Sequence, residues 1–243
     1  MKPFNQLRQH RIVALLTLMT CIVMSSRADV TYTYDSSSAK LTFGGTGEIT
    51  TTIVHGIAGY TDAKTIVIGG GITSIGDLAF ANCTSLTTLS FEGGNTALTV
   101  GKLAFSGTNN LTTFTCMRDF TYTSYSYYSS YGIADPYADY TTCRSGLLSG
   151  TSVKSVNIAT SVTSIPSSTF SGCTQLTSVF FYSTSKVATI GSSAFSGCTS
   201  LTSLTLPASV TTIESRAFSG CKGLTSVTIP SSVTSIGEFA FSG

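Results

Sequence analysis

Few residues of this chain have the types and spacing needed for acid–base or metal chemistry. The 243 residues include 11 acidic side chains and two histidines, and only His55 follows residue 28. The acids are scattered singly, and no G-x-S-x-G motif surrounds a serine. Zinc ligands paired at short spacing are also absent. The sequence therefore predicts no catalytic residue, no metal site and no cofactor; an enzyme would need two acids to meet from distant segments.

Cysteine is the one reactive residue type that recurs in a fixed context. Four of the seven cysteines follow a phenylalanine at the same distance: Cys83, Cys173, Cys198 and Cys221. Thr108 and Thr151 stand near the equivalent position in related segments. A position that accepts either cysteine or threonine is typical of small buried side chains, so we expect inert thiols here.

Two further cysteines, Cys116 and Cys143, bracket a segment that has no counterpart elsewhere. A disulfide between them would suit an exported protein and would stabilise the fold by roughly 3 kcal/mol. Cys116 also matches a buried strand position, where it would be a core residue. Both interpretations remain open at this stage.

The bracketed segment, about residues 116–144, holds most of the tyrosine. Seven of the 11 tyrosines lie in it: Tyr122, Tyr125, Tyr127, Tyr128, Tyr131, Tyr137 and Tyr140. Tyrosine, serine and glycine together resemble the composition of antibody binding loops. Rings of this kind equally suit a hairpin that packs on the rest of the fold. The segment is thus a candidate binding loop, with packing as the alternative.

The elements that must position these residues come from an internal repeat. One phrase recurs around Phe80, Phe105, Phe170, Phe195, Phe218 and Phe241, with Leu148 in the same position. The steps are 22 to 25 residues, apart from one of 43 that contains the tyrosine-rich insertion. Both 25-residue steps carry two extra residues just after the alternating apolar segment, which marks a loop.

Each copy predicts one short strand and one corner. LTSVTIP alternates apolar and polar residues and ends at a proline, which is typical of a strand, whereas GEFAF is typical of a turn or helical corner. Burial of seven apolar side chains gives roughly 10 to 20 kcal/mol, but ordering the backbone costs roughly 1 to 2 kcal/mol per residue. One copy cannot fold alone, so we expect stacked copies with a shared core and a continuous parallel strand ladder.

The repeat L-x-x-V-x-I-P-x-x-V-x-x-I-x-x-x-A-F-x-G-C resembles the BspA-like leucine-rich repeat. The resemblance covers about residues 63–243, and residues 29–62 are similar to the capping β-hairpin of such proteins. It implies a mainly β solenoid with short turns or helices. It also implies a secreted or cell-surface recognition or adhesion module that binds extracellular or cell-surface proteins, with a carbohydrate-binding or structural surface component as the alternative.

The strand ladder offers a second candidate surface. Residues between the buried positions of each strand should face outward in stacked pairs: Thr65/Val67, Thr88/Ser90, Thr113/Thr115, Ser155/Asn157, Ser178/Phe180, Ser203/Thr205 and Ser226/Thr228. Nearly all are hydroxyls or amides, and none is charged. Such a face could hydrogen-bond sugars or a peptide backbone, or could simply be a solvated sheet.

The first 28 residues predict export. A basic start precedes the apolar run 12–24, and Ser26-Arg27-Ala28 suits signal-peptide cleavage. A lipid anchor at Cys21 and an uncleaved anchor are the alternatives. The rest of the chain has nine basic and 11 acidic residues, a net charge of −2, which argues against nucleic acid, and it has no second apolar run of membrane-spanning length.

The last residues, GEFAFSG, stop within a copy of the repeat. An open last rung exposes apolar surface and an unpaired strand edge. We therefore expect either that the sequence continues in a longer protein or that this end associates with another chain, end to end.

Overall fold

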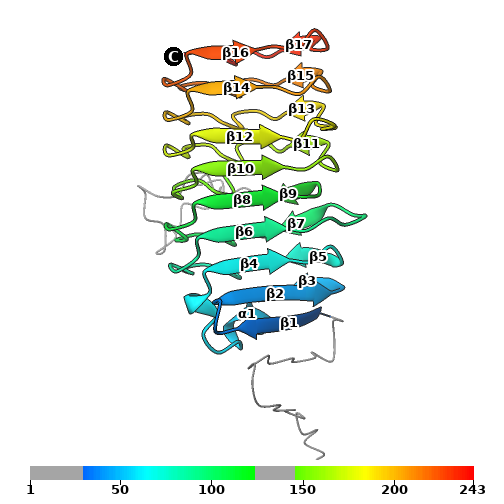
Figure 1. Ribbon diagram of the computed structural model, residues 1–243, viewed down its shortest axis with the longest axis vertical. Coiled ribbons are helices and arrows are strands. Elements are labelled where there is room, and N and C mark those ends of the chain that lie inside the picture. The colour runs from blue at the N-terminus through cyan, green and yellow to red at the C-terminus, as the bar shows by residue number, and fades with distance from the viewer. Residues whose placement is uncertain (1–29, 124–145) are drawn as a thin grey trace, which may run out of the picture.

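The computed structural model describes residues 30–123 and 146–243. In this part of the chain, successive copies of the repeat stack as turns of one solenoid, in chain order from one end to the other (Figure 1). Each turn places a longer strand on one side and a shorter strand on the other. The prediction of a mainly β leucine-rich repeat solenoid is confirmed.

A seven-stranded sheet forms one side of the solenoid. Its strands, in spatial order, are β1 (Val30–Asp35), β2 (Lys40–Gly45), β4 (Thr65–Ile68), β6 (Thr88–Phe91), β8 (Thr113–Cys116), β10 (Ser155–Ile158) and β12 (Ser178–Phe181). The first pair is antiparallel and the others are parallel. Two further strands, β14 (Ser203–Thr205) and β16 (Ser226–Thr228), pair with each other as a separate sheet.

The ladder is therefore not continuous, contrary to the prediction, because β12 and β14 are not paired. The break coincides with Phe180 and Tyr182, two large side chains that are 55% and 45% exposed. Two extra residues of the repeat also fall in the loop that follows β12. Bulky side chains and a longer connection both work against close, regular pairing with the next strand.

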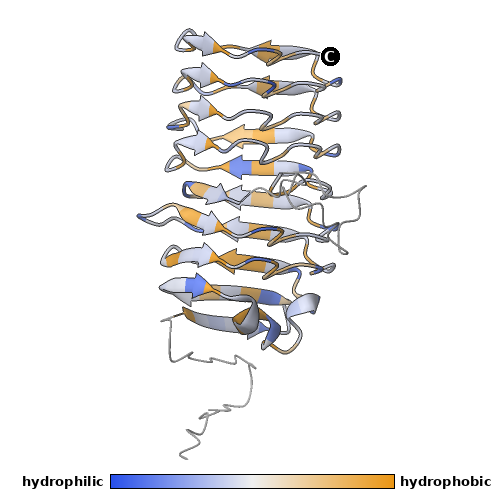
Figure 2. Ribbon diagram, turned by 180° about the vertical axis from the view of Figure 1, so that it is seen from behind, coloured by the Kyte–Doolittle hydropathy of each residue, from blue (hydrophilic) through white to orange (hydrophobic). Residues whose placement is uncertain are grey.

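Short strands form the other side in two parallel sheets. The first contains β3 (Gly47–Ile49), β5 (Ile72–Ile75), β7 (Leu98–Val100) and β9 (Phe120–Tyr122), and the second contains β11 (Ser164–Ile165), β13 (Thr189–Ile190), β15 (Thr212–Ile213) and β17 (Ser235–Ile236). Apolar residues recur at matching places along the stacked turns (Figure 2). They meet between the two sides and form one cluster of buried residues.

Stacked phenylalanine rings run through this core. The centroids of Phe170 and Phe195 are 5.1 Å apart, those of Phe195 and Phe218 are 5.3 Å apart, and those of Phe218 and Phe241 are 5.2 Å apart. Leu148 is fully buried in the equivalent position of its own turn. The expectation that each copy is stable only against its neighbours agrees with this packing.

The corners before and after these rings are turns rather than helices. Ser193 has φ 55° and Gly197 has φ 73°, so one corner contains two residues in the left-handed region. Equivalent non-glycine positions are Leu78, Leu103, Ser168, Arg216 and Phe239. Hydrogen bonds between turns hold this geometry: the Ser193 amide donates to the Ser215 carbonyl at 2.9 Å.

An antiparallel hairpin, β1–β2, covers the N-terminal end of the stack, and β2 continues into the parallel ladder. Asp35 closes the hairpin by accepting hydrogen bonds from Ser37 and Ser38, which lower the pKa of its carboxyl to about 2. The short helix α1 (Thr51–His55) and the 3-10 turn η1 (Tyr60–Asp62) follow. The Thr50 hydroxyl accepts from the Ile53 amide and caps α1.

Candidate binding surfaces

The outward side chains of the longer strands form a surface that we call the ladder face. Its residues are Thr65, Val67, Thr88, Ser90, Thr113, Thr115, Ser155, Asn157, Ser178, Phe180, Ser203, Thr205, Ser226 and Thr228. The register is as the sequence predicts within each sheet. Thr88 lies beside Thr113, and Asn157 lies between Thr115 and Phe180.

Hydroxyl and amide groups dominate the ladder face, and some of them bond with each other. The Asn157 amide donates to the Thr115 hydroxyl at 3.5 Å. The Ser90 hydroxyl donates to a Glu92 carboxylate oxygen at 2.8 Å, and Ser90 is only 9% exposed. Ser90 is therefore less available to a ligand than its outward position predicts. The face itself carries no charged residue, so it offers hydrogen bonds rather than ion pairs.

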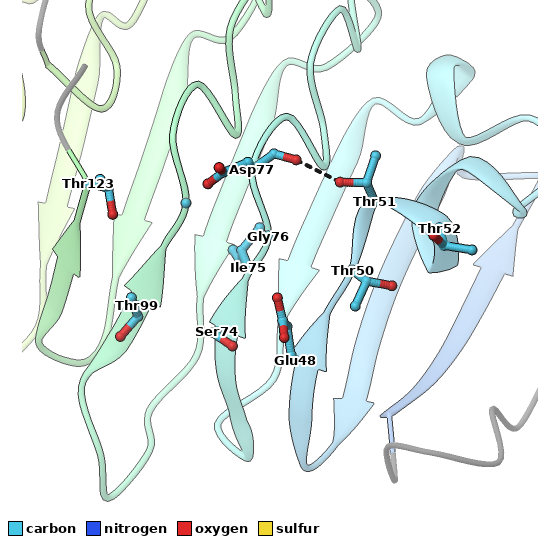
Figure 3. Close-up of a pocket in the computed structure, with 11 residues that line it drawn as sticks. Glu48, Thr50, Thr51, Thr52, Ser74, Ile75, Gly76, Asp77, Thr99 and Thr123 are labelled. Carbon is cyan, nitrogen blue, oxygen red and sulfur yellow. Dashed lines mark hydrogen bonds between the residues drawn. The ribbon is translucent and has the colours of Figure 1, made fainter. Parts of the chain in front are cut away.

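A hollow of about 560 Å³ lies on the opposite side of the solenoid, along β3, β5 and β7 (Figure 3). Ser74, Thr99 and Thr123 line it together with the carboxylates of Glu48 and Asp77. Asp77 already has a structural partner, because its Oδ1 accepts from the Lys102 amide at 2.6 Å. The hollow is polar and open, but its best-placed acid is engaged in holding two turns together.

Other chemistry finds no cluster of suitable groups in the described ranges. No three histidine, cysteine or acidic side chains meet there in a way that could hold a metal ion. Among residues 30–123 and 146–243, no helix has the length and hydropathy needed to cross a bilayer.

The recurring cysteines are buried, as expected. The thiol of Cys198 donates to the Phe170 carbonyl at 3.2 Å, and that of Cys221 donates to the Phe195 carbonyl at 3.1 Å. Thr108 fills the same place in its turn and donates to the Phe105 carbonyl at 2.7 Å. Burial raises the pKa of Cys83 to about 12, which keeps this thiol in its unreactive neutral form.

The tyrosine-rich insertion is described only at its start. Tyr122 is half-buried against the core in β9, and its hydroxyl donates to the Ser167 carbonyl of a later turn. Burial raises the pKa of Tyr122 to about 12. This ring therefore packs on the solenoid. The remaining candidates, Tyr125, Tyr127, Tyr128, Tyr131, Tyr137 and Tyr140, lie outside the described residues.

Cys116 lies at a buried strand position, which agrees with one of the two interpretations. Its thiol donates to the Arg118 carbonyl at 3.0 Å, and burial raises its pKa to about 12. Cys143 lies outside the described residues. A disulfide between the two stays a prediction.

Sequence reasoning missed Arg118, which is only 1% exposed. Its guanidinium donates to the carbonyls of Gly70 at 3.0 Å, Ile72 at 2.7 Å and Gly69 at 3.4 Å. Burial lowers the pKa of Arg118. This side chain connects the start of the insertion to a turn 46 to 49 residues earlier, a distance that no local pattern could reveal.

Comparison with known families agrees with this architecture. Residues 51–136 and 139–243 match the BspA type leucine-rich repeat region, six copies. The match covers most of the chain, so the chain belongs to this family. Comparison with curated proteins found no match.

Several solved structures of bacterial leucine-rich repeat proteins are similar. One from Bacteroides ovatus is 26% identical with a TM-score of 0.51, over 77% of this chain and 48% of that protein. One from Eubacterium ventriosum is 24% identical with a TM-score of 0.44, over 90% and 62%. A leucine-rich cell surface protein from Faecalibacterium prausnitzii is 17% identical with a TM-score of 0.38, over 93% and 92%. The chain thus spans less than two thirds of the first two proteins.

Proposed function

We propose that this protein is a non-catalytic recognition module, exported by its N-terminal segment, that binds proteins on the surface of host or neighbouring cells. The ladder face is the observation that carries the proposal. It is an uncharged array of hydrogen-bonding side chains on a rigid stack of strands, and its register repeats from turn to turn. Several weak contacts along such an array add up to useful avidity.

The family assignment supports a binding role over catalysis, because repeat solenoids generally serve as extended binding scaffolds. Membership in the family does not identify the ligand. The tyrosine-rich insertion is a second surface for the same role. Its start lies in β9, on the side of the solenoid that carries the shorter strands.

The test is capture of surface-biotinylated proteins from microbial and animal cells by the purified chain. We expect Asn157→Lys to weaken capture, because it places a long charged side chain in the middle of the ladder face. Thr121→Lys, at an exposed position of β9, is the matched control and should capture normally. Equal capture by both variants would exclude the ladder face as the binding surface.

A third variant, with Tyr125, Tyr127 and Tyr128 all replaced by alanine, tests the insertion. Lost capture with an unchanged melting temperature supports binding by the loop, whereas a large fall in melting temperature supports packing. Export is tested separately: cell fractionation should find the protein outside the cytoplasm, with an N-terminus at Asp29. Retention of residues 1–28 in the cytoplasmic fraction would contradict export.

A further inference from the structure

The ladder face changes character at one place, on β12. Phe180 and Tyr182 are separated by one residue, so they leave the extended strand on the same face. Their ring centroids are 5.1 Å apart with an interplanar angle of 80°. The two side chains are 55% and 45% exposed. Single exposed apolar residues are ordinary, but two touching rings on a face of hydroxyl groups form a distinct patch.

Polar groups lie on one flank of this ring pair. Asn157 of β10 is the direct neighbour of Phe180 in the parallel register. Its amide reaches the Thr115 hydroxyl of β8. The Tyr182 amide donates to the Ile158 carbonyl at 3.4 Å, which places the small side chain of Ala159 beside Tyr182. The rings therefore stand next to an amide, a hydroxyl and a methyl group, with no bulky side chain of β10 covering them.

The other flank of the ring pair is the break in the ladder. Since β12 is not paired with β14, the rings lie at the edge of the seven-stranded sheet. Thr205 of β14 and Thr228 of β16 continue the polar array beyond the break. An exposed aromatic pair is thus flanked by hydrogen-bonding groups on both sides.

We propose that Phe180 and Tyr182 form a platform for uncharged hexose units of a glycan, with Asn157 and Thr115 as hydrogen-bonding partners. A pyranose ring presents C–H groups on its face, which pack on an aromatic ring, and hydroxyl groups at its edge, which need donors and acceptors when they leave water. The patch supplies both kinds of contact side by side.

Charge and spacing favour a neutral glycan over other ligands. The ladder face has no cationic residue to pair with a sialic acid or a sulfate. Its hydroxyl rows recur at the strand spacing of about 4.8 Å, which is similar to the length of one hexose unit in an extended chain. A polymer with a regular series of hydroxyl groups therefore matches a face with a regular series of hydroxyl groups.

This inference deepens the proposed function and rests on it, because a chain that stays in the cytoplasm would not meet such glycans. It names the ligand chemistry at one end of the ladder face. The hexose units could belong to a free polysaccharide or to the glycans of a surface protein, and both present the same chemistry to the platform.

The experiment uses the purified chain on an array of neutral gluco-, manno- and galacto-oligosaccharides, with sialylated and sulfated glycans and unglycosylated peptides as further arms. We expect neutral glycans to bind and Phe180→Ala/Tyr182→Ala to weaken that binding by about tenfold or more. Phe239→Ala is the matched control, because Phe239 is a 59% exposed aromatic residue outside the platform. It should bind normally.

A second variant separates ligand contact from folding. The chain has no tryptophan, so Tyr182→Trp places the only indole at the platform. We expect this variant to retain binding and its emission to shift when a neutral oligosaccharide is added. Enzymatic removal of glycans from captured surface proteins, compared with binding to free polysaccharide, identifies the source of the hexose units.

Three results would overturn the inference: no binding of any neutral glycan, equal binding by the double alanine variant, or binding restricted to charged glycans or peptides. If the double variant fails to fold, the Tyr182→Trp emission decides alone. Continued capture of surface proteins without any glycan binding would reject the platform and leave the proposed function standing. Failure of export together with intact glycan binding would do the reverse.

Discussion

The guanidinium of Arg118 is the most constrained charged group in the described part of the chain, since it donates to three carbonyl groups inside the solenoid. We expect Arg118→Met to lower the free energy of unfolding by about 3 kcal/mol, because the carbonyl groups lose their donors while the volume stays similar. Urea titration measures the change. Lys186→Met, at an exposed position, is the control and should change stability by less than about 0.5 kcal/mol.

The opposite outcome for Arg118 would also be informative. A variant as stable as the unaltered chain would mean that desolvation of the cation costs as much as its hydrogen bonds return. Its Nε has no hydrogen-bond partner, which adds to that cost.

The buried thiols predict a loss of stability at alkaline pH. Burial raises the pKa of Cys83 and Cys116 from 9.0 to about 12. Between these values the unfolded chain releases a proton that the folded chain retains, so unfolding becomes easier as the pH rises from 9 towards 12. Thermal melts over this range should show the decline, and Cys83→Ser should reduce it. A decline of the same slope in that variant would assign the effect to other groups.

Cysteine burial was predictable at the residue scale, whereas the role of Arg118 was not. The cysteine position recurs in four copies, and threonine replaces it in others, so one sequence contains the evidence. Arg118 occurs once, and its acceptors lie near residue 70. Phe180 was placed on the ladder face from the strand alternation, but its contact with Tyr182 depends on side-chain angles that a sequence does not encode locally.

The phenylalanine stack makes a prediction at the scale of elements. Phe195 is fully buried between Phe170 and Phe218, and we expect Phe195→Ala to cost about 3 to 5 kcal/mol. Phe241 is 37% exposed and its ring stacks only on Phe218 among the printed ring contacts, so Phe241→Ala should cost clearly less. Urea unfolding of both variants measures the difference. Equal losses would mean that the terminal turn is as constrained as an interior one.

Strands were predictable from period and proline position, but the corners were only partly so. The glycine of the A-F-S-G-C phrase fits its left-handed φ, as at Gly197. Ser193, in the same corner, has φ 55° without being glycine. Such a residue costs roughly 1 to 2 kcal/mol in isolation, and hydrogen bonds from the neighbouring turns offset that cost. Tertiary bonding of this kind also explains why the corners are turns rather than helices.

At the scale of the whole molecule, the solenoid followed from one inequality: a single copy buries too little apolar surface to offset its own ordering. The same inequality fixes the N-terminal hairpin, which covers the first turn. It says nothing about ligands, since the outward residues do not affect whether the copies stack. The ligand therefore has to be inferred from departures from the repeat, of which the Phe180–Tyr182 pair is the clearest in the described part.

The last turn carries the remaining prediction, because its apolar side chains are only partly covered. Ile229, Ile236 and Phe241 are 40%, 50% and 37% exposed, and β16 and β17 each pair with one neighbour. A hollow of about 220 Å³ opens beside Val227 and Phe241. We propose that the 243-residue chain associates end to end through this surface, since pairing of two such ends would cover both the apolar side chains and the strand edges.

Sedimentation at several protein concentrations tests this association. We expect the unaltered chain to form larger species as its concentration rises, and Ile229→Thr/Ile236→Thr to raise the dissociation constant by about tenfold or more, because it removes apolar area while keeping the β-branched shape. Leu78→Thr is the control, since Leu78 is 47% exposed at a corner near the N-terminal end. An unaltered chain that stays monomeric at every concentration would exclude pairing through this end. Association that survives in the double variant but not in the control would move the interface to the corners of the solenoid.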